Sequence, residues 1–413
     1  MKLLLLSILL TGWLGPMSTK ATKSPIIFFP GVTNSALDVR NNGGGFCNTG
    51  DTAQRLWIEP LRLFLCGEQE LSLKYDPTTN FFEGRPGVMV EVPGFGGTED
   101  VEYMGLSQTL PYLVTFIEYF VDRGYVRGKS IRTVPYDWRL AADELERRGY
   151  FNNVQSLVEE TYIENGNQKV TLVAHSMGGL VSHHFLTSYS GINQEWKDKY
   201  IHAWVPLSGA WSGGVQTLAR VIYGGDFDND LLSYVINGFL VPILRTFPSI
   251  PWLTPRESVF KNTVLISTPS TNYTAANLKQ LFDKIGYKNG FQIYNHLTTV
   301  VTPNFPPPNV NTFCYYGYNV PTPETFVLKQ DLNKDVIGMQ AANVVMGNGD
   351  GTVNQASSAV CHQWQRMDPK YSFWVRQYEQ VNHSEMVTNE RVLSDVALIA
   401  GASPPTSRVS REQ

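Results

Sequence analysis

The sequence predicts an α/β fold, in which helices cover both faces of a mostly parallel sheet. Predicted strands and helices alternate along the first half of the chain, and a buried strand over residues 170–174 leads through a tight turn into a helix. The chain also contains Ser176, Asp350 and His383 in the order in which α/β hydrolases carry their catalytic residues. With 413 residues, the chain can form one large domain with insertions, or two domains.

The first 18 residues predict a secretory signal. Lys2 precedes an apolar run from Leu3 to Leu10, and small residues follow this run. We expect the mature chain to begin between Ser18 and Ser24. No later segment reaches the roughly 18 uninterrupted apolar residues of a membrane span. A formal net charge of −4, without a long basic run, argues against binding to nucleic acid.

A buried strand is predicted over residues 24–29, and Pro30-Gly31 follows it as a turn. In α/β serine hydrolases, the loop after such a strand supplies one N–H group of the oxyanion hole, and the residue after the nucleophile supplies the other. We assign these two N–H groups to Val32 and Met177. An ordinary turn at the end of a strand is the alternative.

Two apolar segments each allow two interpretations. Residues 56–65 include Trp57, Leu61 and Phe64, and they form either a core-facing helix or an exposed loop that docks on lipid with Trp57 as its anchor. Residues 231–244 are apolar on nearly all sides but too interrupted to span a bilayer. They form either a mobile lid over an apolar substrate or a buried cap helix.

The four cysteines predict disulfides, because no pattern of metal ligands accompanies them and we expect no metal. Three pairings are possible, and the order of the cysteines suggests Cys47 with Cys66 and Cys314 with Cys361. Asn272-Tyr273-Thr274 is a glycosylation sequon. Asn382 also begins a sequon, but its place beside His383 predicts that it is not glycosylated.

The residues around 176 predict a nucleophile elbow. The segment Ala174-His175-Ser176-Met177-Gly178 joins the buried strand to a helix, so the Ser176 hydroxyl lies at a sharp corner. Small residues are needed there, because the strand and helix backbones nearly touch. Ala174 stands where glycine is usual. A plain strand-to-helix turn is the alternative.

Other elements follow from apolar periodicity and from Gly and Pro positions. Residues 303–308 and 320–323, which are rich in proline, predict an irregular return to the core. The predicted helices cover residues 111–125, 153–164 and 390–400, and the predicted strands cover residues 130–134, 201–207 and 377–381.

Asp350 and His383 are the predicted partners of Ser176. A serine hydroxyl needs a base to take its proton, and the base needs a carboxylate to fix its tautomer. Asp350 lies in the turn Gly349-Asp350-Gly351 after a predicted strand, and His383 lies in a loop before the last helix. A simple turn aspartate is the alternative for Asp350. Of the other histidines, His175 beside the nucleophile is expected to be structural, and His183 and His184 in the following helix are expected to pack or face solvent. The histidines at 202, 296 and 362 lack a matching context.

With these residues in place, the chain resembles the lecithin:cholesterol acyltransferase and lysosomal phospholipase A2 family over nearly its whole mature length. The segments that carry the resemblance are Ala174–Gly178, Pro135-Tyr136-Asp137-Trp138-Arg139, Trp196–Ile201, Thr268–Thr274, Val320–Pro323 and Gly349–Asn354.

The resemblance implies an α/β-hydrolase core over residues 24–413, with a membrane-binding insertion near residues 40–75 and a cap with a lid near residues 208–330. It also implies a Ca-independent phospholipase and O-acyltransferase without cofactors, which forms an acyl-serine with Ser176, Asp350 and His383. The family's disulfide pairing agrees with the pairing given above. The lysosomal members carry an acidic residue where this chain has Val32, so a preference for acid pH does not follow.

The expected partners are a phospholipid membrane or lipoprotein surface and a lipid alcohol as acyl acceptor. We expect a monomer in the lysosomal lumen or outside the cell. Two alternatives are a sterol O-acyltransferase and a catalytically silent lipid carrier that keeps the fold.

Overall fold

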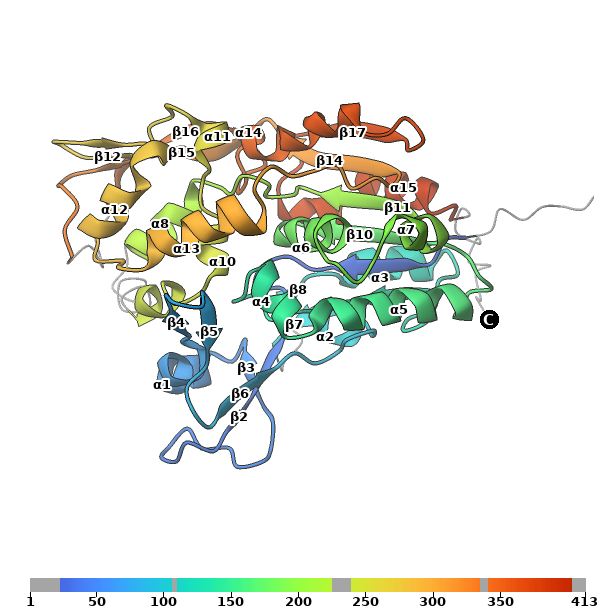
Figure 1. The fold of residues 1–413 in the computed structure, drawn as a ribbon, viewed down its shortest axis with the longest axis horizontal. Coiled ribbons are helices and arrows are strands. Elements are labelled where there is room, and N and C mark those ends of the chain that lie inside the picture. Colours follow the sequence, from blue (N-terminus) through green and yellow to red (C-terminus); the bar gives the residue numbers. More distant parts are fainter. Residues whose placement is uncertain (1–22, 106–109, 225–238, 335–340, 403–413) are drawn as a thin grey trace, which may run out of the picture.

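The centre of the molecule is a six-stranded sheet in which every strand pair is parallel. The computed structural model describes residues 23–105, 110–224, 239–334 and 341–402. The predicted α/β fold with a parallel sheet is confirmed (Figure 1). In spatial order the strands are β17 (Phe373–Glu379), β14 (Thr312–Tyr318), β11 (Ile201–Leu207), β10 (Val170–His175), β1 (Ile26–Phe29) and β9 (Ile131–Thr133).

Helices bury both faces of this sheet. Successive side chains of a strand point to opposite faces. Leu172 therefore packs in one hydrophobic cluster and Val173 in the other, and both are fully buried. The first cluster includes residues of α4 (Ala142–Arg147), α5 (Tyr150–Glu164) and α6 (Met177–Thr187), and the second includes residues of α3 (Val114–Val121) and α15 (Glu390–Ile399).

A second sheet beside the first carries the turn that contains Asp350. The expected irregular segment at residues 320–323 is in fact the start of strand β15, so that prediction is wrong. Proline has no N–H to donate to a neighbouring strand. Pro321 and Pro323 are nevertheless compatible with β15, because β12 pairs with this strand only at Phe326 and Val327, and the β12 side of the two prolines therefore needs no backbone donor. This sheet contains β13 (Asn272–Tyr273), β12 (Ile266–Ser267), β15 (Val320–Leu328) and β16 (Ala341–Gly349) in spatial order.

Short helices and turns form the cap over the carboxyl edge of the main sheet (Figure 1). Residues 239–244 are helical, whereas residues 231–238 of the predicted lid lie outside the described residues, as does the predicted signal. None of the described helices is long and apolar enough to cross a bilayer. The helical segments of this part of the chain are α8 (Gln216–Ile222), α10 (Ser249–Trp252), α11 (Glu257–Phe260), η1 (Ala275–Asn277), α12 (Leu278–Lys284), α13 (Gly290–His296) and η2 (Leu297–Val301).

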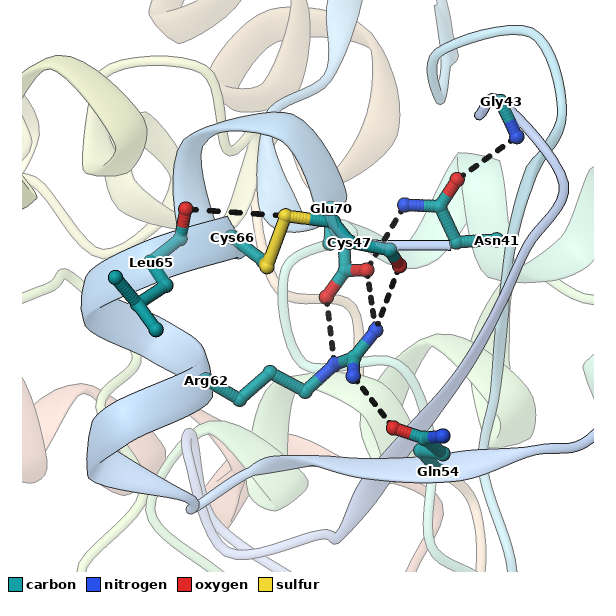
Figure 2. The surroundings of a disulfide bond; sticks show 8 residues. All are labelled: Asn41, Gly43, Cys47, Gln54, Arg62, Leu65, Cys66 and Glu70. Atoms are coloured by element: carbon teal, nitrogen blue, oxygen red, sulfur yellow. Dashed lines mark hydrogen bonds and ion pairs between the residues drawn. A yellow bond between two sulfur atoms is a disulfide. The ribbon is translucent and has the colours of Figure 1, made fainter. Parts of the chain in front are cut away.

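An insertion after β1 forms a small three-stranded sheet with one helix, α1 (Pro60–Leu71). Figure 2 shows how the Cys47–Cys66 disulfide and Arg62 hold this helix against the sheet. The Arg62 Nε donates to the fully buried carboxylate of Glu70 at 2.9 Å, and Asn41 donates to the same carboxylate at 2.9 Å. The strands are β3 (Gln54–Trp57), β2 (Leu37–Asn41) and β6 (Val88–Glu91) in spatial order.

The predicted modification sites have clear positions. Cys314 pairs with Cys361, as the order of the cysteines suggests. Asn272 is exposed, but it lies on the short edge strand β13 and not in a loop. The remaining elements are β4 (Lys74–Asp76), β5 (Phe81–Glu83), α2 (Glu99–Glu102), β7 (Tyr103–Met104), β8 (Leu110–Pro111), α7 (Gln194–Tyr200), α14 (Gln355–Ser358), η3 (Ala359–Arg366) and η4 (Ser384–Val387).

Replacing Glu70 with Ala should destabilise the insertion, because the Arg62 guanidinium then loses its carboxylate in a largely buried site. We expect the free energy of unfolding, measured by urea denaturation, to fall by about 3 kcal/mol. Glu68→Ala is the control, because Glu68 and Arg85, its ion-pair partner at 3.6 Å, are both exposed. It should cost less than about 1 kcal/mol. Equal stability of the two variants would contradict this account of the insertion.

Candidate active site

Ser176 lies at a strained corner between β10 and α6. Its φ of 57° falls in the left-handed region that residues with a Cβ rarely adopt, and its own N–H donates to the Leu207 carbonyl on the neighbouring strand at 3.0 Å. The chain reverses here from the end of the strand into the helix. The side chain at position 176 therefore projects at the carboxyl edge of the sheet, as the elbow motif predicts.

Gly178 is required by the close approach of this helix to strand β1. A Cβ at position 178 would lie 2.4 Å from the Phe29 carbonyl oxygen and 2.5 Å from the Pro30 carbonyl oxygen. Both atoms belong to backbone that is held in the sheet or just after it, so neither can move away cheaply. The glycine thus fixes the distance between the corner at Ser176 and the loop that follows β1.

Asp350 and His383 are in direct contact, although 33 residues separate them in sequence. The His383 Nδ1 lies 2.8 Å from Asp350 Oδ2, and the His383 backbone N–H donates to the Asp350 carbonyl at 2.7 Å. Because an ionised carboxylate only accepts hydrogen bonds, Nδ1 carries the proton in this pair. The other ring nitrogen, Nε2, is then free to accept a proton.

The environment of Asp350 keeps its carboxyl group ionised. The side chain is fully buried, which alone would raise its pKa. The charge and hydrogen bond of His383, together with hydrogen bonds from the Val353 N–H and Ser208, outweigh burial and hold the pKa of Asp350 below its ordinary value. The Thr352 N–H also donates to Oδ1, at 3.1 Å. A buried, ionised carboxylate is what stabilises a charged imidazole beside it.

His175 contacts both the loop of His383 and Tyr112. Its Nε2 lies 2.9 Å from the His383 carbonyl oxygen, and its Nδ1 lies 3.0 Å from the Tyr112 hydroxyl. The rings of His175 and His383 lie with their centroids 4.7 Å apart. Burial and the nearby His383 lower the pKa of His175 to about 3, so this ring stays neutral. His175 thus links the elbow to the loop that carries His383.

The hydroxyl of Ser176 makes no hydrogen bond to any group in the described part of the chain. Ser176 is 6% exposed, and it lines a cavity. The structure therefore pairs Asp350 with His383 and places Ser176 beside His175, but it does not form the hydrogen bond from Ser176 to His383. Hydrogen bonds between catalytic groups are commonly loose when no substrate is bound.

The N–H groups of Val32 and Met177 are both positioned near Ser176. Among the described residues, neither group donates a hydrogen bond. Met177 is the first residue of α6, where N–H groups have no partner within the helix. A Cβ at Gly31, next to Val32, would lie 3.2 Å from the Ser176 Cβ. Both residues therefore lie near the serine, and their role as an oxyanion hole stays a prediction.

An apolar cavity of about 450 Å³ extends from Ser176 beneath the cap. The residues at positions 240–253 that line it come from the cap, and Trp138 and Leu71 come from the core and the insertion. A cavity of this size and lining suits a hydrocarbon chain. The apolar side chains around it are Val32, Trp57, Leu71, Trp138, Ala210, Leu240, Ile243, Leu244, Phe247, Ile250, Leu253 and Val353.

The apolar segment at residues 56–65 matches the expected core-facing helix in part and the expected exposed lipid contact in part. Leu63 is buried, whereas Leu61 and Phe64 on the same helix are 71% and 57% exposed. Trp57 is not an exposed anchor: its indole N–H donates to the Thr33 carbonyl at 2.7 Å, and its ring packs against Trp138 with centroids 4.8 Å apart. Sequence periodicity could not predict this, because the contact depends on how the insertion folds back over the loop after β1.

The remaining histidines serve other contacts. His183 is stacked on Trp364 and binds the Pro306 carbonyl, and His184 binds Glu146. The His296 Nε2 lies 2.9 Å from the Asp143 carboxylate on α4. In the described ranges of the chain, no group of three or more His, Cys, Asp or Glu side chains is placed to hold a metal ion.

Comparison with known proteins finds relatives over most of the chain. A profile described as lecithin:cholesterol acyltransferase matches residues 54–302 and 293–391. A phosphatidylcholine-sterol acyltransferase of Gallus gallus is 33% identical over 345 residues, which cover 82% of this chain and 80% of the relative. Lysosomal phospholipase A and acyltransferase of Bos taurus is 32% identical over 408 residues, which cover 94% of this chain and 96% of the relative. The Homo sapiens protein of that name is 31% identical over 405 residues, which cover 95% of this chain and 94% of the relative.

Replacing Gly178 with Ala should damage both stability and the geometry of the elbow, because the new methyl group meets two backbone oxygens. We expect the free energy of unfolding to fall by about 2 kcal/mol or more. Gly179→Ala is the matched control, since its nearest contact, 3.1 Å away, is with the Trp211 ring. Thermal unfolding should show a smaller loss for this control. A Gly178→Ala protein as stable as the wild type would refute the close approach.

Proposed function

The chain belongs to the lecithin:cholesterol acyltransferase family, and from this premise we propose that Ser176, His383 and Asp350 cleave an acyl ester of a glycerophospholipid. The protein is an α/β-hydrolase enzyme of a family of lipid acyltransferases and phospholipases. The observation that carries the proposal for these residues is the buried Asp350–His383 pair beside a serine elbow that opens into an apolar cavity.

In the first half of the proposed reaction, the Ser176 oxygen attacks the acyl carbonyl carbon. Its proton passes to Nε2 of His383, and the Asp350 carboxylate stabilises the imidazolium that forms. The N–H groups of Val32 and Met177 donate to the negatively charged oxygen of the tetrahedral intermediate. His383 then gives its proton to the departing alcohol of the lysophospholipid. This leaves the acyl group on Ser176.

In the second half, water or a lipid alcohol accepts the acyl group. The acceptor gives its proton to His383 as it attacks the acyl-serine, and His383 returns a proton to the Ser176 oxygen as this leaves. Hydrolysis and transacylation therefore share one intermediate, and the acceptor alone decides between them. A sterol O-acyltransferase is the alternative, since one relative is named a phosphatidylcholine-sterol acyltransferase.

The apolar cavity supports a long-chain acyl group as the substrate. Its lining from the cap and core offers hydrocarbon contacts, and each buried methylene contributes about 0.8 kcal/mol to binding. A silent lipid carrier would also need such a cavity. It would not need a buried aspartate that holds a histidine in one tautomer, and this argues for catalysis.

A lipid surface is the proposed place of action. Leu61, Phe64 and Leu65 form an exposed apolar patch on α1, and Phe64 contacts Phe239 of the cap with ring centroids 6.0 Å apart. The patch thus lies next to the cap that covers the cavity, so a lipid drawn from a bilayer has a short way to Ser176. The two disulfides fit the secretory pathway, and they support residence in the lysosomal lumen or outside the cell.

Replacing Ser176 with Ala should abolish release of fatty acid from phosphatidylcholine vesicles, because no acyl-enzyme can form. We expect the rate to fall by about a million-fold, as for other serine hydrolases that lose the nucleophile. Mass spectrometry of the lipid products is the measurement, and Ser188→Ala, at the end of α6, is the control. Turnover like that of the wild type would rule out Ser176 as the nucleophile.

A second prediction concerns the patch on α1. The double variant Leu61→Ser, Phe64→Ser should weaken binding to phosphatidylcholine vesicles in a flotation assay by about tenfold, because two apolar side chains no longer enter the bilayer. The ratio of activity on vesicles to activity on a short soluble ester should fall in parallel. Leu398→Ser is the control, since Leu398 is equally apolar and 80% exposed on α15. The same loss for this control would count against a specific membrane contact.

A further inference from the structure

A chain of hydrogen bonds joins the loop after β1 to the loop after β17, and it runs through Tyr112 and His175. The Gly31 N–H donates to the Tyr112 hydroxyl at 3.1 Å. The same hydroxyl lies 3.0 Å from Nδ1 of His175, and the other nitrogen of that ring, Nε2, lies 2.9 Å from the His383 carbonyl oxygen. The reaction proposed above gives these contacts no role.

The neutral ring of His175 allows only one arrangement of protons along this chain. A carbonyl oxygen can only accept, so Nε2 of His175 carries the proton that binds the His383 carbonyl. Nδ1 of the same ring is then an acceptor, and the Tyr112 hydroxyl donates its proton to it. The oxygen of that hydroxyl accepts the Gly31 N–H. The partners of His175 therefore select its tautomer.

Burial keeps both rings in these protonation states. It lowers the pKa of His175, which is 3% exposed, and it raises the pKa of the Tyr112 hydroxyl, which therefore keeps its proton. A buried donor or acceptor that loses its partner is costly. Each group in the chain thus holds the next one in place.

The chain of hydrogen bonds adjoins each of the groups that we propose to react. Gly31 precedes Val32, a proposed oxyanion donor, and His175 precedes Ser176. A Cβ at Gly31 would lie 3.3 Å from Nδ1 of His175 and 3.2 Å from the Ser176 Cβ, so the loop after β1 packs directly on the elbow. The carbonyl at the far end belongs to His383, the proposed base. Oxyanion loop, nucleophile and base are therefore tied together.

The backbone of His383 is held on two sides. Its N–H donates to the Asp350 carbonyl at 2.7 Å, and its carbonyl accepts the proton of His175. Asp350 comes from the second sheet, so its bonds alone do not set the place of His383 relative to Ser176. His175 is covalently joined to Ser176, and its bond to His383 therefore fixes the base against the nucleophile.

We propose that Tyr112 and His175 are positioning residues, which hold the His383 loop and the loop of Val32 against the elbow. This inference rests on the acyl-serine reaction proposed above. His175 binds the His383 loop, while Tyr112 selects the tautomer that makes this bond possible and ties it to Gly31. Neither side chain lines the apolar cavity, so their loss should slow the attack by Ser176 and leave substrate binding unchanged.

Tyr112→Phe tests this chain, because it removes one hydroxyl and keeps the ring. Nδ1 of His175 then loses its donor, and the tautomer that binds His383 is no longer selected. We expect a fluorophosphonate to label Ser176 of this variant to completion, but about tenfold more slowly than in the wild type. A partly misfolded protein would instead show fast labelling of a smaller fraction of its molecules. Peptide mass spectrometry follows both the rate and the final extent.

Tyr119→Phe is the matched control, because it also removes a tyrosine hydroxyl, and Tyr119 on α3 contacts Arg123 through the face of its ring. It should be labelled at the rate of the wild type. For each variant, kcat on a short soluble ester is calculated per labelled serine. Tyr112→Phe should lower this kcat in parallel with the labelling rate and leave KM unchanged, because the lost contact acts on the reacting groups and not on binding.

Two substitutions of His175 separate its two contacts. The amide N–H of His175→Gln can take the place of Nε2, whereas the shorter side chain of His175→Asn does not reach the His383 carbonyl. We expect His175→Asn to lower the labelling rate by about a hundredfold, because a small displacement of the base has an effect of this size. His175→Gln should recover most of that loss.

Labelling of Tyr112→Phe at the wild-type rate, or equal losses in the two His175 variants, would overturn the inference. Failure of the proposed acyl-serine reaction would look different, because the wild type itself would then carry no adduct on Ser176.

Discussion

The buried carboxylate of Asp350 is the group on which the arrangement of the proposed active site depends. The carboxylate accepts hydrogen bonds from the Val353 N–H and the ring N–H of His383. The backbone carbonyl of Asp350 accepts the His383 backbone N–H. These bonds join the turn after β16 to the loop after β17. Loss of the imidazole would leave a buried charge unpaired, at a cost of several kcal/mol. The second sheet therefore does more than support the cap, because the turn after it carries the carboxylate that contacts His383, the proposed base.

The elbow positions the groups around Ser176, and the cap encloses the cavity beside it. Gly178 lets α6 lie against β1, and this brings the Met177 N–H and the loop at Val32 to the same corner. The cap and the insertion then enclose an apolar cavity around that corner, while the outer face of α1 stays exposed beside the cap. The proposed catalytic groups, which lie at the edge of the sheet, thus border an apolar cavity next to an exposed apolar helix face.

Much of the fold followed from local patterns. The strand before Ser176, the glycines after it and the final strand and helix around His383 are all visible in sequence, because periodicity and turn chemistry act over a few residues. The pairing of Asp350 with His383 could be expected from chain order, although its distances could not. Strand β15 was missed, because prolines normally exclude a strand and only its unpaired side makes them acceptable. The position of Trp57 depends on contacts between distant segments, which no local pattern encodes.

The most direct test of this account is the reaction of the protein with a fluorophosphonate, which labels only an activated serine. Peptide mass spectrometry after a short incubation should find the adduct on Ser176 in the wild type, and the rate of labelling should fall steeply in Asp350→Asn, where the His383 tautomer is no longer fixed. An adduct on another serine, or labelling of Ser176 at the same rate without the carboxylate, would contradict the claim that Asp350 and His383 activate this hydroxyl.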